Sequence, residues 1–308
     1  MTIGAKPPAE VAIDSSLVRA LLLEQHADLA SLPMVDIDSG WDNRMYRLGE
    51  NLAVRLPRRA AAADLIENEQ RWLPVLSPRL PLAIPVPLRT GRPSGDFPWP
   101  WSVVPWLDGQ NAAVAPPRDA VTTAFELGQF LRALHQPAPN DAPRNPWRGV
   151  PLAHRTQDVL SRATQLGDQI DGARVVALWG EIVRAPPWSG PPLWIHGDLH
   201  PGNLLVSHGR VSAVVDFGDL TGGDPATDLS AAWMMLPPSA WPTFRTSARG
   251  PFDPIDDHTW VRARGWALAL GLAYLASSRD DPQLEALGRA AIHAVLNEHA
   301  LQAADAPP

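Results

Sequence analysis

The chain has 308 residues, enough for one large domain or two lobes, and it contains no cysteine, which excludes disulfides, zinc–thiolate sites and thiol catalysis. Hydrophobic residues make up 45% and charged residues 19% of the chain, as in an ordinary globular protein. The net charge of −7 argues against a nucleic-acid partner, because the densest basic cluster holds only three arginines, at positions 55, 58 and 59.

Targeting and membrane signals are weak in this chain. The first ten residues lack the apolar core of a signal peptide. The longest apolar stretch, 266–276, is too short to span a bilayer. We therefore expect a cytoplasmic location and no membrane partner.

The first third of the chain alternates between helical and strand-like patterns. Hydrophobic periodicity predicts helices at 17–27 and 60–76 and strands at 34–38, 44–48, 52–56 and 101–105. An extended, edge-like run is expected at 84–88, where Pro85 and Pro87 remove two ladder donors.

The remainder of the chain is predicted to be mainly helical. Helices are expected at 120–135, 153–166, 173–185, 257–277 and 281–304, and a further helix after Asp224 would carry Trp233 and Met234. One β-hairpin interrupts them, with strands near 204–206 and 211–215 around a polar turn at 207–210.

The chemistry-bearing residues flank this hairpin. His196, Asp198 and Asn203 match the H-x-D-x-x-x-x-N catalytic loop of protein kinases, and Asp216 opens a D-F-G metal motif. Asp198 can orient an attacking hydroxyl group and accept its proton, while Asn203 and Asp216 can hold magnesium ions. The hairpin would bring Asn203 and Asp216 to the same edge. The pattern predicts transfer of the terminal phosphoryl group of a nucleotide.

The segment from His196 to Asn203, with Gly197 where protein kinases have arginine, resembles the aminoglycoside phosphotransferase and choline-kinase-like family. The resemblance implies an α+β, protein-kinase-like bilobal fold with a small β-rich N-lobe and a larger, mainly helical C-lobe. We expect the N-lobe at 1–104, a hinge at 105–109 and the C-lobe at 110–308. The resemblance also implies ATP or GTP as donor, Mg²⁺, and a small hydroxylated acceptor.

The phosphate-binding strand departs from the kinase pattern. Ala53 and Arg55 stand where kinases have the alanine and lysine of V-A-I-K, and the only lysine of the chain is Lys6. Arg55 can bind phosphate oxygens in a bidentate manner. Glu69 is its expected ion-pair partner on the following helix, with Glu67 as the competitor.

Three further features follow from the resemblance. The Pro105 carbonyl and the Leu107 amide would bind the edge of the adenine base, and the loop at Ser39 and Gly40 would cover the phosphates. An aspartate at the position of Asp228 would brace the backbone of the catalytic loop.

His196 and several residues that follow the motif could also serve in other roles. His196 is expected to be a buried residue that shapes the loop rather than a zinc ligand. Tryptophans 233, 241, 260 and 266 and aspartates 253, 256 and 257 follow the catalytic motif, in the part of the chain where this family builds its acceptor pocket. Asp256 or Asp257 is instead favoured as a helix cap.

The predicted activity is O-phosphorylation of a hydroxylated antibiotic, aminoglycoside-like or other. The alternative is a kinase of a small metabolite such as choline, a sugar or an amino alcohol. A nucleotide-binding regulatory pseudokinase is supported only by the missing lysine, and a protein kinase is disfavoured because the sequence after Asp216 has no A-P-E-type segment. The sequence leaves open the acceptor, the oligomeric state and the choice between ATP and GTP.

Overall fold

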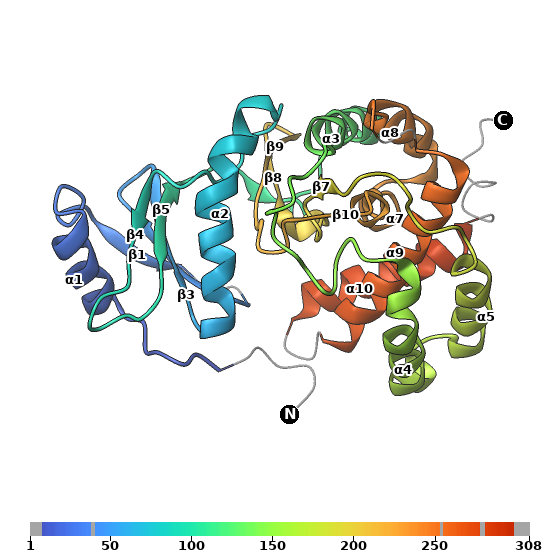
Figure 1. The fold of residues 1–308 in the computed structure, drawn as a ribbon, viewed down its shortest axis with the longest axis horizontal. Coiled ribbons are helices and arrows are strands. Elements are labelled where there is room, and N and C mark those ends of the chain that lie inside the picture. Colours follow the sequence, from blue (N-terminus) through green and yellow to red (C-terminus); the bar gives the residue numbers. More distant parts are fainter. Residues whose placement is uncertain (1–7, 38–40, 253–254, 278–280, 299–308) are drawn as a thin grey trace. The chain divides into compact units, whose positions relative to one another are not determined.

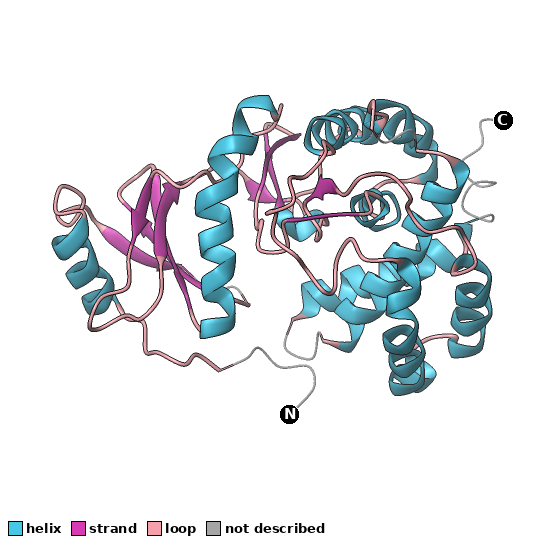
Figure 2. Ribbon diagram, viewed as in Figure 1, coloured by secondary structure: helices cyan, strands magenta, loops and turns pink. Residues whose placement is uncertain are grey.

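The computed structural model describes residues 8–37, 41–252, 255–277 and 281–298 (Figure 1). It divides into two compact units. The N-terminal unit comprises the described residues up to Gly109 together with Ala213–Gly218. The C-terminal unit comprises Gln110–Ser212 and the described residues from Asp219 onward. The larger sheet belongs to the N-terminal unit, and helices dominate the C-terminal unit (Figure 2).

The N-terminal unit is an antiparallel sheet with a helix on each face (Figure 1). Its strands follow the order β1-β2-β3-β5-β4, with β1 at Met34–Ile37, β2 at Asn43–Leu48, β3 at Leu52–Pro57, β4 at Arg89–Gly91 and β5 at Trp101–Pro105. Helix α1 spans Ser15–Gln25 and helix α2 spans Ala63–Leu76. Asp14 caps α1, because its carboxylate accepts the Leu17 N–H at 2.9 Å.

The two faces of β3 have different partners. Val54 and Leu56 point into a buried apolar cluster that also holds Val18 and Leu22 of α1. Ala53 and Arg55 alternate with them and lie on the opposite face, where Arg55 meets α2. Period-two alternation in the sequence predicted this separation of the two faces, and the structure confirms it.

The sheet edge and the start of α2 differ from expectation. The edge strand beside β5 is β4, and the predicted extended run at 84–88 lies before it, outside any strand. Pro85 and Pro87 cannot donate to a ladder, and regular pairing begins only after them. The predicted helix at 60–76 opens with a 3₁₀ turn at Ala60–Ala62 before α2 begins.

The C-terminal unit is built around helix α9 (Asp257–Ala276), which is buried along most of its length and packs on α4, α5, α6, α7 and α10. A helix that is apolar on all sides needs neighbours all round. The other helices are α3 (Ala120–Leu134), α4 (Thr156–Leu166), α5 (Gly172–Ile182), α6 (Ala226–Leu229), α7 (Ala231–Met235), α8 (Trp241–Ala248) and α10 (Pro282–Leu296).

Short strands carry the loop that holds the kinase-like motif. Strand β7 (Leu193–Ile195) pairs with β10 (Thr221–Gly223), and a second sheet has the order β6-β8-β9, with β6 at Gln110–Asn111, β8 at Leu204–Ser207 and β9 at Arg210–Val214. The turn between β8 and β9 places His208 and Gly209 at φ 54° and 82°. Two positive φ values are typical of a tight hairpin turn. The predicted hairpin is confirmed.

Several helical predictions need correction. The helix expected after Asp224 is broken at Ser230 into α6 and α7, and α8 was not anticipated. In α3, the apolar residues at 121, 124, 125, 127, 131 and 134 predicted one amphipathic face, but Val121 and Phe125 are exposed, while Phe130 is fully buried. Among the described residues, no helix combines the length and apolar content required to cross a bilayer.

Candidate active site

The N-terminal unit contains a buried ion pair between β3 and α2. Arg55 Nη1 donates to Glu69 Oε2 at 2.6 Å and Arg55 Nη2 donates to Glu69 Oε1 at 3.2 Å, a bidentate arrangement. Glu69 is buried because it lies on the inner face of α2 with Ile66 and Leu73, whereas Glu67 is exposed. The structure thus brings Arg55 and Glu69 together and leaves Glu67 apart.

Asp216 belongs to the same unit as this pair. Burial lowers the pKa of Arg55, but the Glu69 and Asp216 carboxylates outweigh it and raise that pKa. Burial and Asp216 raise the pKa of Glu69 against the opposing effect of Arg55. Asp216 is exposed and has φ 63°, a left-handed conformation that is uncommon for aspartate. Strain of this kind clusters at functional sites, and an exposed carboxylate suits a magnesium ligand.

The predicted nucleotide-binding backbone lies at the end of β5. Pro105 pairs with Leu52, and the Trp106 N–H donates a hydrogen bond to the Asn51 carbonyl oxygen at 2.7 Å. Leu107 is half-buried in the connection that follows. Ser39 and Gly40 lie outside the described residues. The roles of these four residues in nucleotide binding remain predictions.

In the C-terminal unit, Asp228 holds the start of the catalytic loop. Its two carboxylate oxygens accept the backbone N–H groups of His196 and Gly197, each at 2.8 Å. His135 Nε2 lies 3.2 Å from the same carboxylate, and Asp228 is fully buried. The predicted bracing role of Asp228 is confirmed.

Gly197 is required by the shape of this loop. Its φ is 87°, and a Cβ atom there would lie 2.6 Å from the Asp219 carbonyl oxygen. His196 is fully buried, and its Nδ1 accepts the Asp198 N–H at 3.2 Å, as expected for a residue that shapes the loop. Among the described residues, no group of three or more His, Asp or Glu side chains could hold a metal ion.

His200 and Asn203 complete the loop. His200 Nδ1 accepts the Gly202 N–H at 3.0 Å, so the neutral ring carries its proton on Nε2, which lies 3.4 Å from Asp198 Oδ2. Asn203 Nδ2 donates to the Asp198 carbonyl at 2.9 Å. The amide group therefore has its oxygen left to offer a cation, and oxygen is the ligand that Mg²⁺ prefers.

Three side chains surround the Asp198 carboxylate: Arg148, His200 and Tyr274. Its Oδ1 accepts the Tyr274 hydroxyl at 2.6 Å and Arg148 Nη2 at 3.2 Å. Burial on its own raises the pKa of Asp198, but Arg148, His200 and Tyr274 outweigh it and hold that pKa well below its usual range. With both lone pairs of Oδ1 in use, Oδ2 is the oxygen that can still accept a hydroxyl group.

Three residues around Asp198 were not found by sequence reasoning. Arg148, Tyr274 and Asp219 come from a loop, from α9 and from the segment before β10. Arg148 Nη2 lies 3.3 Å from Asp219 Oδ2, so it bridges two carboxylates. No local motif marks an arginine in a proline-rich connection; only Asp219, two residues after Phe217, stood near a recognised motif.

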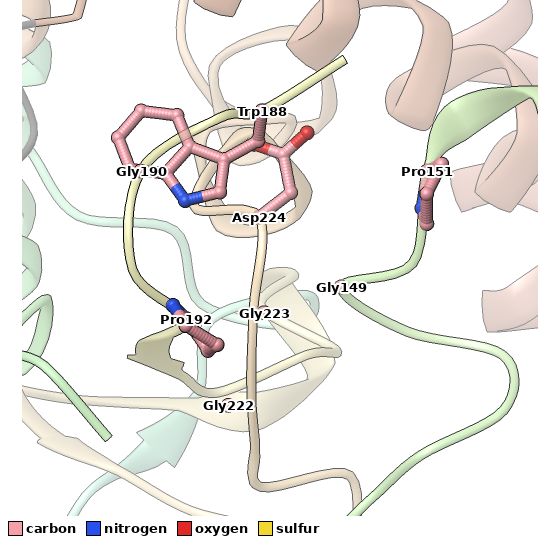
Figure 3. A pocket seen from close by; sticks show the side chains of 8 residues that line it. All are labelled: Gly149, Pro151, Trp188, Gly190, Pro192, Gly222, Gly223 and Asp224. Atoms are coloured by element: carbon pink, nitrogen blue, oxygen red, sulfur yellow. The ribbon is translucent and has the colours of Figure 1, made fainter. Parts of the chain in front are cut away.

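A pocket of about 230 Å³ opens in the same unit (Figure 3). Its lining includes Gly149, Gly222 and Gly223, the Trp188 indole and Asp224. The Asp224 carboxylate accepts two hydrogen bonds from Arg262, at 2.7 and 3.2 Å, and both residues are buried. The pocket thus has one aromatic side chain, and the charge of Asp224 at its wall is paired with Arg262.

The aromatic residues after the catalytic loop separate into two groups. Trp233, Trp241 and Trp260 pack together with ring centroids 4.7–6.3 Å apart. Trp266 is instead fully buried in α9. Asp256 accepts the Thr259 N–H at 2.7 Å and caps α9, as favoured from the sequence, and Asp253 lies outside the described residues.

Comparison with protein families agrees with this arrangement. The family model for APH, described as the phosphotransferase enzyme family, matches residues 34–266, well over half of the chain. The chain belongs to this family. An aminoglycoside 3'-phosphotransferase from Escherichia coli is 30% identical over 113 residues, which cover 36% of this chain and 42% of the relative. The chain thus matches less than half the length of its curated relatives.

Solved structures share the fold over almost the whole chain. The GDP complex of aminoglycoside 2'-phosphotransferase-IIIa has a TM-score of 0.64 at 17% identity, covering 93% of this chain and 100% of the other. A macrolide 2'-phosphotransferase from Brachybacterium faecium has a TM-score of 0.59 at 21% identity, covering 92% and 98%. The kinase-like fold predicted from the catalytic motif is therefore confirmed.

Proposed function

We propose that this member of the phosphotransferase family transfers the γ-phosphoryl group of ATP or GTP to a hydroxyl group of a small acceptor. The observation that carries the proposal is the setting of Asp198, an ionised carboxylate on a loop anchored by Asp228. A structural acid needs no free oxygen, whereas Asp198 Oδ2 keeps a lone pair for an incoming hydroxyl group.

The donor side of the reaction would use the N-terminal unit. Arg55, fixed by its bidentate bond to Glu69, would bind phosphate oxygens, and the predicted Pro105 and Leu107 backbone groups would bind the base. Asn203 and Asp216 have the oxygen atoms that suit Mg²⁺. When bound, magnesium would neutralise charge on the donor phosphates.

The acceptor side would depend on Asp198 as an orienting group. A carboxylate with a strongly lowered pKa is a weak base, so it would not remove the hydroxyl proton before the reaction begins. It would hold the hydroxyl oxygen in line and receive the proton late, as the new O–P bond forms. Catalysis would then come mainly from positioning and charge stabilisation.

We propose a hydroxylated antibiotic as the first class of acceptor. Support comes from the proteins to which the chain is similar, which include aminoglycoside and macrolide phosphotransferases. A small metabolite such as choline, a sugar or an amino alcohol is the second class. Because nucleotide donors are cytoplasmic, we place the reaction in the cytoplasm.

The proposal is tested by a nucleotide-consumption screen with ATP and GTP against hydroxylated antibiotics and small metabolites, followed by mass detection of an added phosphate. Asp198→Ala should abolish transfer while leaving nucleotide affinity within about threefold of wild type, because Asp198 faces the acceptor rather than the donor. Turnover retained by Asp198→Ala would remove the basis of the assignment.

A further inference from the structure

The carboxylates nearest to the reacting position are already neutralised by an arginine of the same unit. Arg148 Nη2 lies 3.2 Å from Asp198 Oδ1 and 3.3 Å from Asp219 Oδ2. The other Asp219 oxygen accepts the Asn145 amide at 2.6 Å. A cationic group arriving beside Asp198 would therefore meet a guanidinium rather than two free carboxylates.

Two more arginines of the same stretch of chain lie within electrostatic reach of Arg148. Arg155 is 5% exposed and pairs with Asp158 at 2.8 Å. Burial lowers the pKa of Arg155 against the opposing charge of Asp158, and the charges of Arg162 and Arg148 lower it further. Burial and Arg148 likewise lower the pKa of Arg162, against the effect of Asp158. The charges of these three guanidinium groups therefore act on one another.

Two N–H groups of this cluster have no hydrogen-bond partner among the described residues. They are Arg148 Nε and Arg162 Nη1, and both atoms are buried. A buried N–H without a partner costs about 1–3 kcal/mol relative to one that is bonded. Such donors are suited to an oxygen acceptor, neutral or anionic, and they repel an ammonium group.

Three other acids of this unit are also engaged by groups of the chain. Asp224, at the pocket in Figure 3, is bonded to Arg262, and Asp228 is occupied by the catalytic-loop amides. Asp256 is occupied by the first turn of α9. None of these three carboxylates is therefore free to receive a polycationic ligand.

We infer that the acceptor of the proposed reaction presents an oxygen-rich face, neutral or carboxylate-bearing, beside its reacting hydroxyl group and carries no ammonium group there, and that Arg148 enforces this choice. This inference rests on the proposed function for the identity of the site. It separates the chain from enzymes whose acceptors are polycations, and it makes Arg148 a specificity-determining residue.

The first experiment measures kanamycin binding to the Mg²⁺–ADP-loaded protein by titration calorimetry at low salt. Wild-type protein should bind it weakly. Arg148→Gln frees the carboxylates of Asp198 and Asp219, so it should bind kanamycin at least tenfold more tightly, with an affinity that falls as salt rises. Arg289→Gln, which removes a positive charge from an exposed position of α10, is the matched control and should behave as wild type.

A second variant keeps the test valid if Arg148→Gln fails to fold. Arg162→Gln removes one charge of the cluster without breaking the Arg148 contacts to Asp198 and Asp219, and it should increase kanamycin affinity several-fold. Arg148→Lys keeps the charge and should keep the weak binding. The inference is overturned if wild type already binds kanamycin more tightly than Arg148→Gln does, or if neither glutamine variant differs from Arg289→Gln.

A matched set of probes distinguishes the two oxygen chemistries. Gluconate, sorbitol and glucamine share a six-carbon polyol chain and differ in one terminal group, a carboxylate, a hydroxymethyl or an aminomethyl. Ligand-observed NMR should rank glucamine last for wild type and raise its rank in Arg148→Gln. Gluconate ahead of sorbitol indicates a carboxylate-bearing acceptor and the reverse order a neutral one, while glucamine in first place contradicts the inference.

Failure of the inference and failure of the proposed function give different results. If wild type phosphorylates kanamycin and Arg148→Gln does not improve its KM, the phosphotransferase assignment stands and the inference falls. If no compound is phosphorylated but Arg148→Gln gains cation binding, the charge argument stands and the assignment is in question.

Discussion

The pair formed by Arg55 and Glu69 allows a structural role to be separated from a nucleotide-binding one. Both side chains are almost fully buried, with 7% and 1% exposure, and two hydrogen bonds join them. Removing one partner leaves an uncompensated buried charge, whereas replacing both with apolar side chains of similar volume removes the charge problem altogether. The informative perturbation is therefore the set Arg55→Met, Glu69→Leu and the double variant.

Each single variant should lose about 3–5 kcal/mol of stability, because the remaining charge stays buried without its partner. Glu69→Leu also leaves the Phe217 backbone N–H without its carboxylate, and Arg55→Met leaves Glu69 facing Asp216 alone. The double variant should be close to wild type or more stable, as found when buried ion pairs become apolar. Urea denaturation followed by circular dichroism measures all four proteins.

Nucleotide affinity should not recover with stability. Loss of Arg55 removes charge-assisted hydrogen bonds worth about 1.5–3 kcal/mol, which predicts at least a tenfold loss of Mg²⁺–ATP affinity in the double variant. Arg92→Met combined with Glu67→Leu makes the same chemical changes at exposed positions of the same unit and serves as the control. A stable double variant with wild-type nucleotide affinity would refute the assignment of Arg55 to the phosphates.

Three further predictions follow from single contacts. Asp228→Ala should lower the free energy of unfolding by about 3 kcal/mol or more, because two buried loop amides lose their acceptor. A change below about 1 kcal/mol in urea denaturation would contradict the bracing role. Burial and then the charge of Asp198 raise the pKa of Tyr274 well above 10. The neutral phenol therefore contributes stability below pH 10 that is lost as pH rises further. Tyr274→Phe should lose less stability than wild type over this alkaline range. Because the chain has only two tyrosines, absorbance at alkaline pH can follow Tyr274 directly. Gly209→Ala should cost about 1 kcal/mol in the same denaturation assay, since φ 82° strains any residue with a Cβ, and an unchanged midpoint would argue against a strained turn.

Local patterns in the sequence predicted much of the fold. Period-two alternation located β3 and assigned Ala53 and Arg55 to one face, and helical spacing selected Glu69 over Glu67. The match of three motif residues to the kinase loop led to the fold that the solved structures share. These features depend on residues close together in the chain, where periodicity and spacing carry the information.

The predictions that failed depend on contacts distant in sequence. Arg148 and Tyr274 lie 50 and 76 positions from Asp198, and nothing near either residue marks it as a partner of that carboxylate. Val121 and Phe125 fit an apolar stripe on α3, yet the packing of α3 against α8 buries a different face. A helix that was not anticipated cannot be used to choose which side of its neighbour is covered.

The short segment Ala213–Gly218 has a consequence for how the protein is made. It groups with the N-terminal unit, where Ala83 bridges to Ala213 and accepts the Val214 N–H at 3.0 Å, and where the Phe217 backbone bonds to Glu69. On the ribosome, the N-terminal unit therefore cannot complete its fold when Gly109 emerges. Roughly another hundred residues must be translated first, at about 5–20 residues per second. For several seconds Glu69 would lack its hydrogen bond from the Phe217 backbone, and a chaperone could bind the incomplete unit during that time.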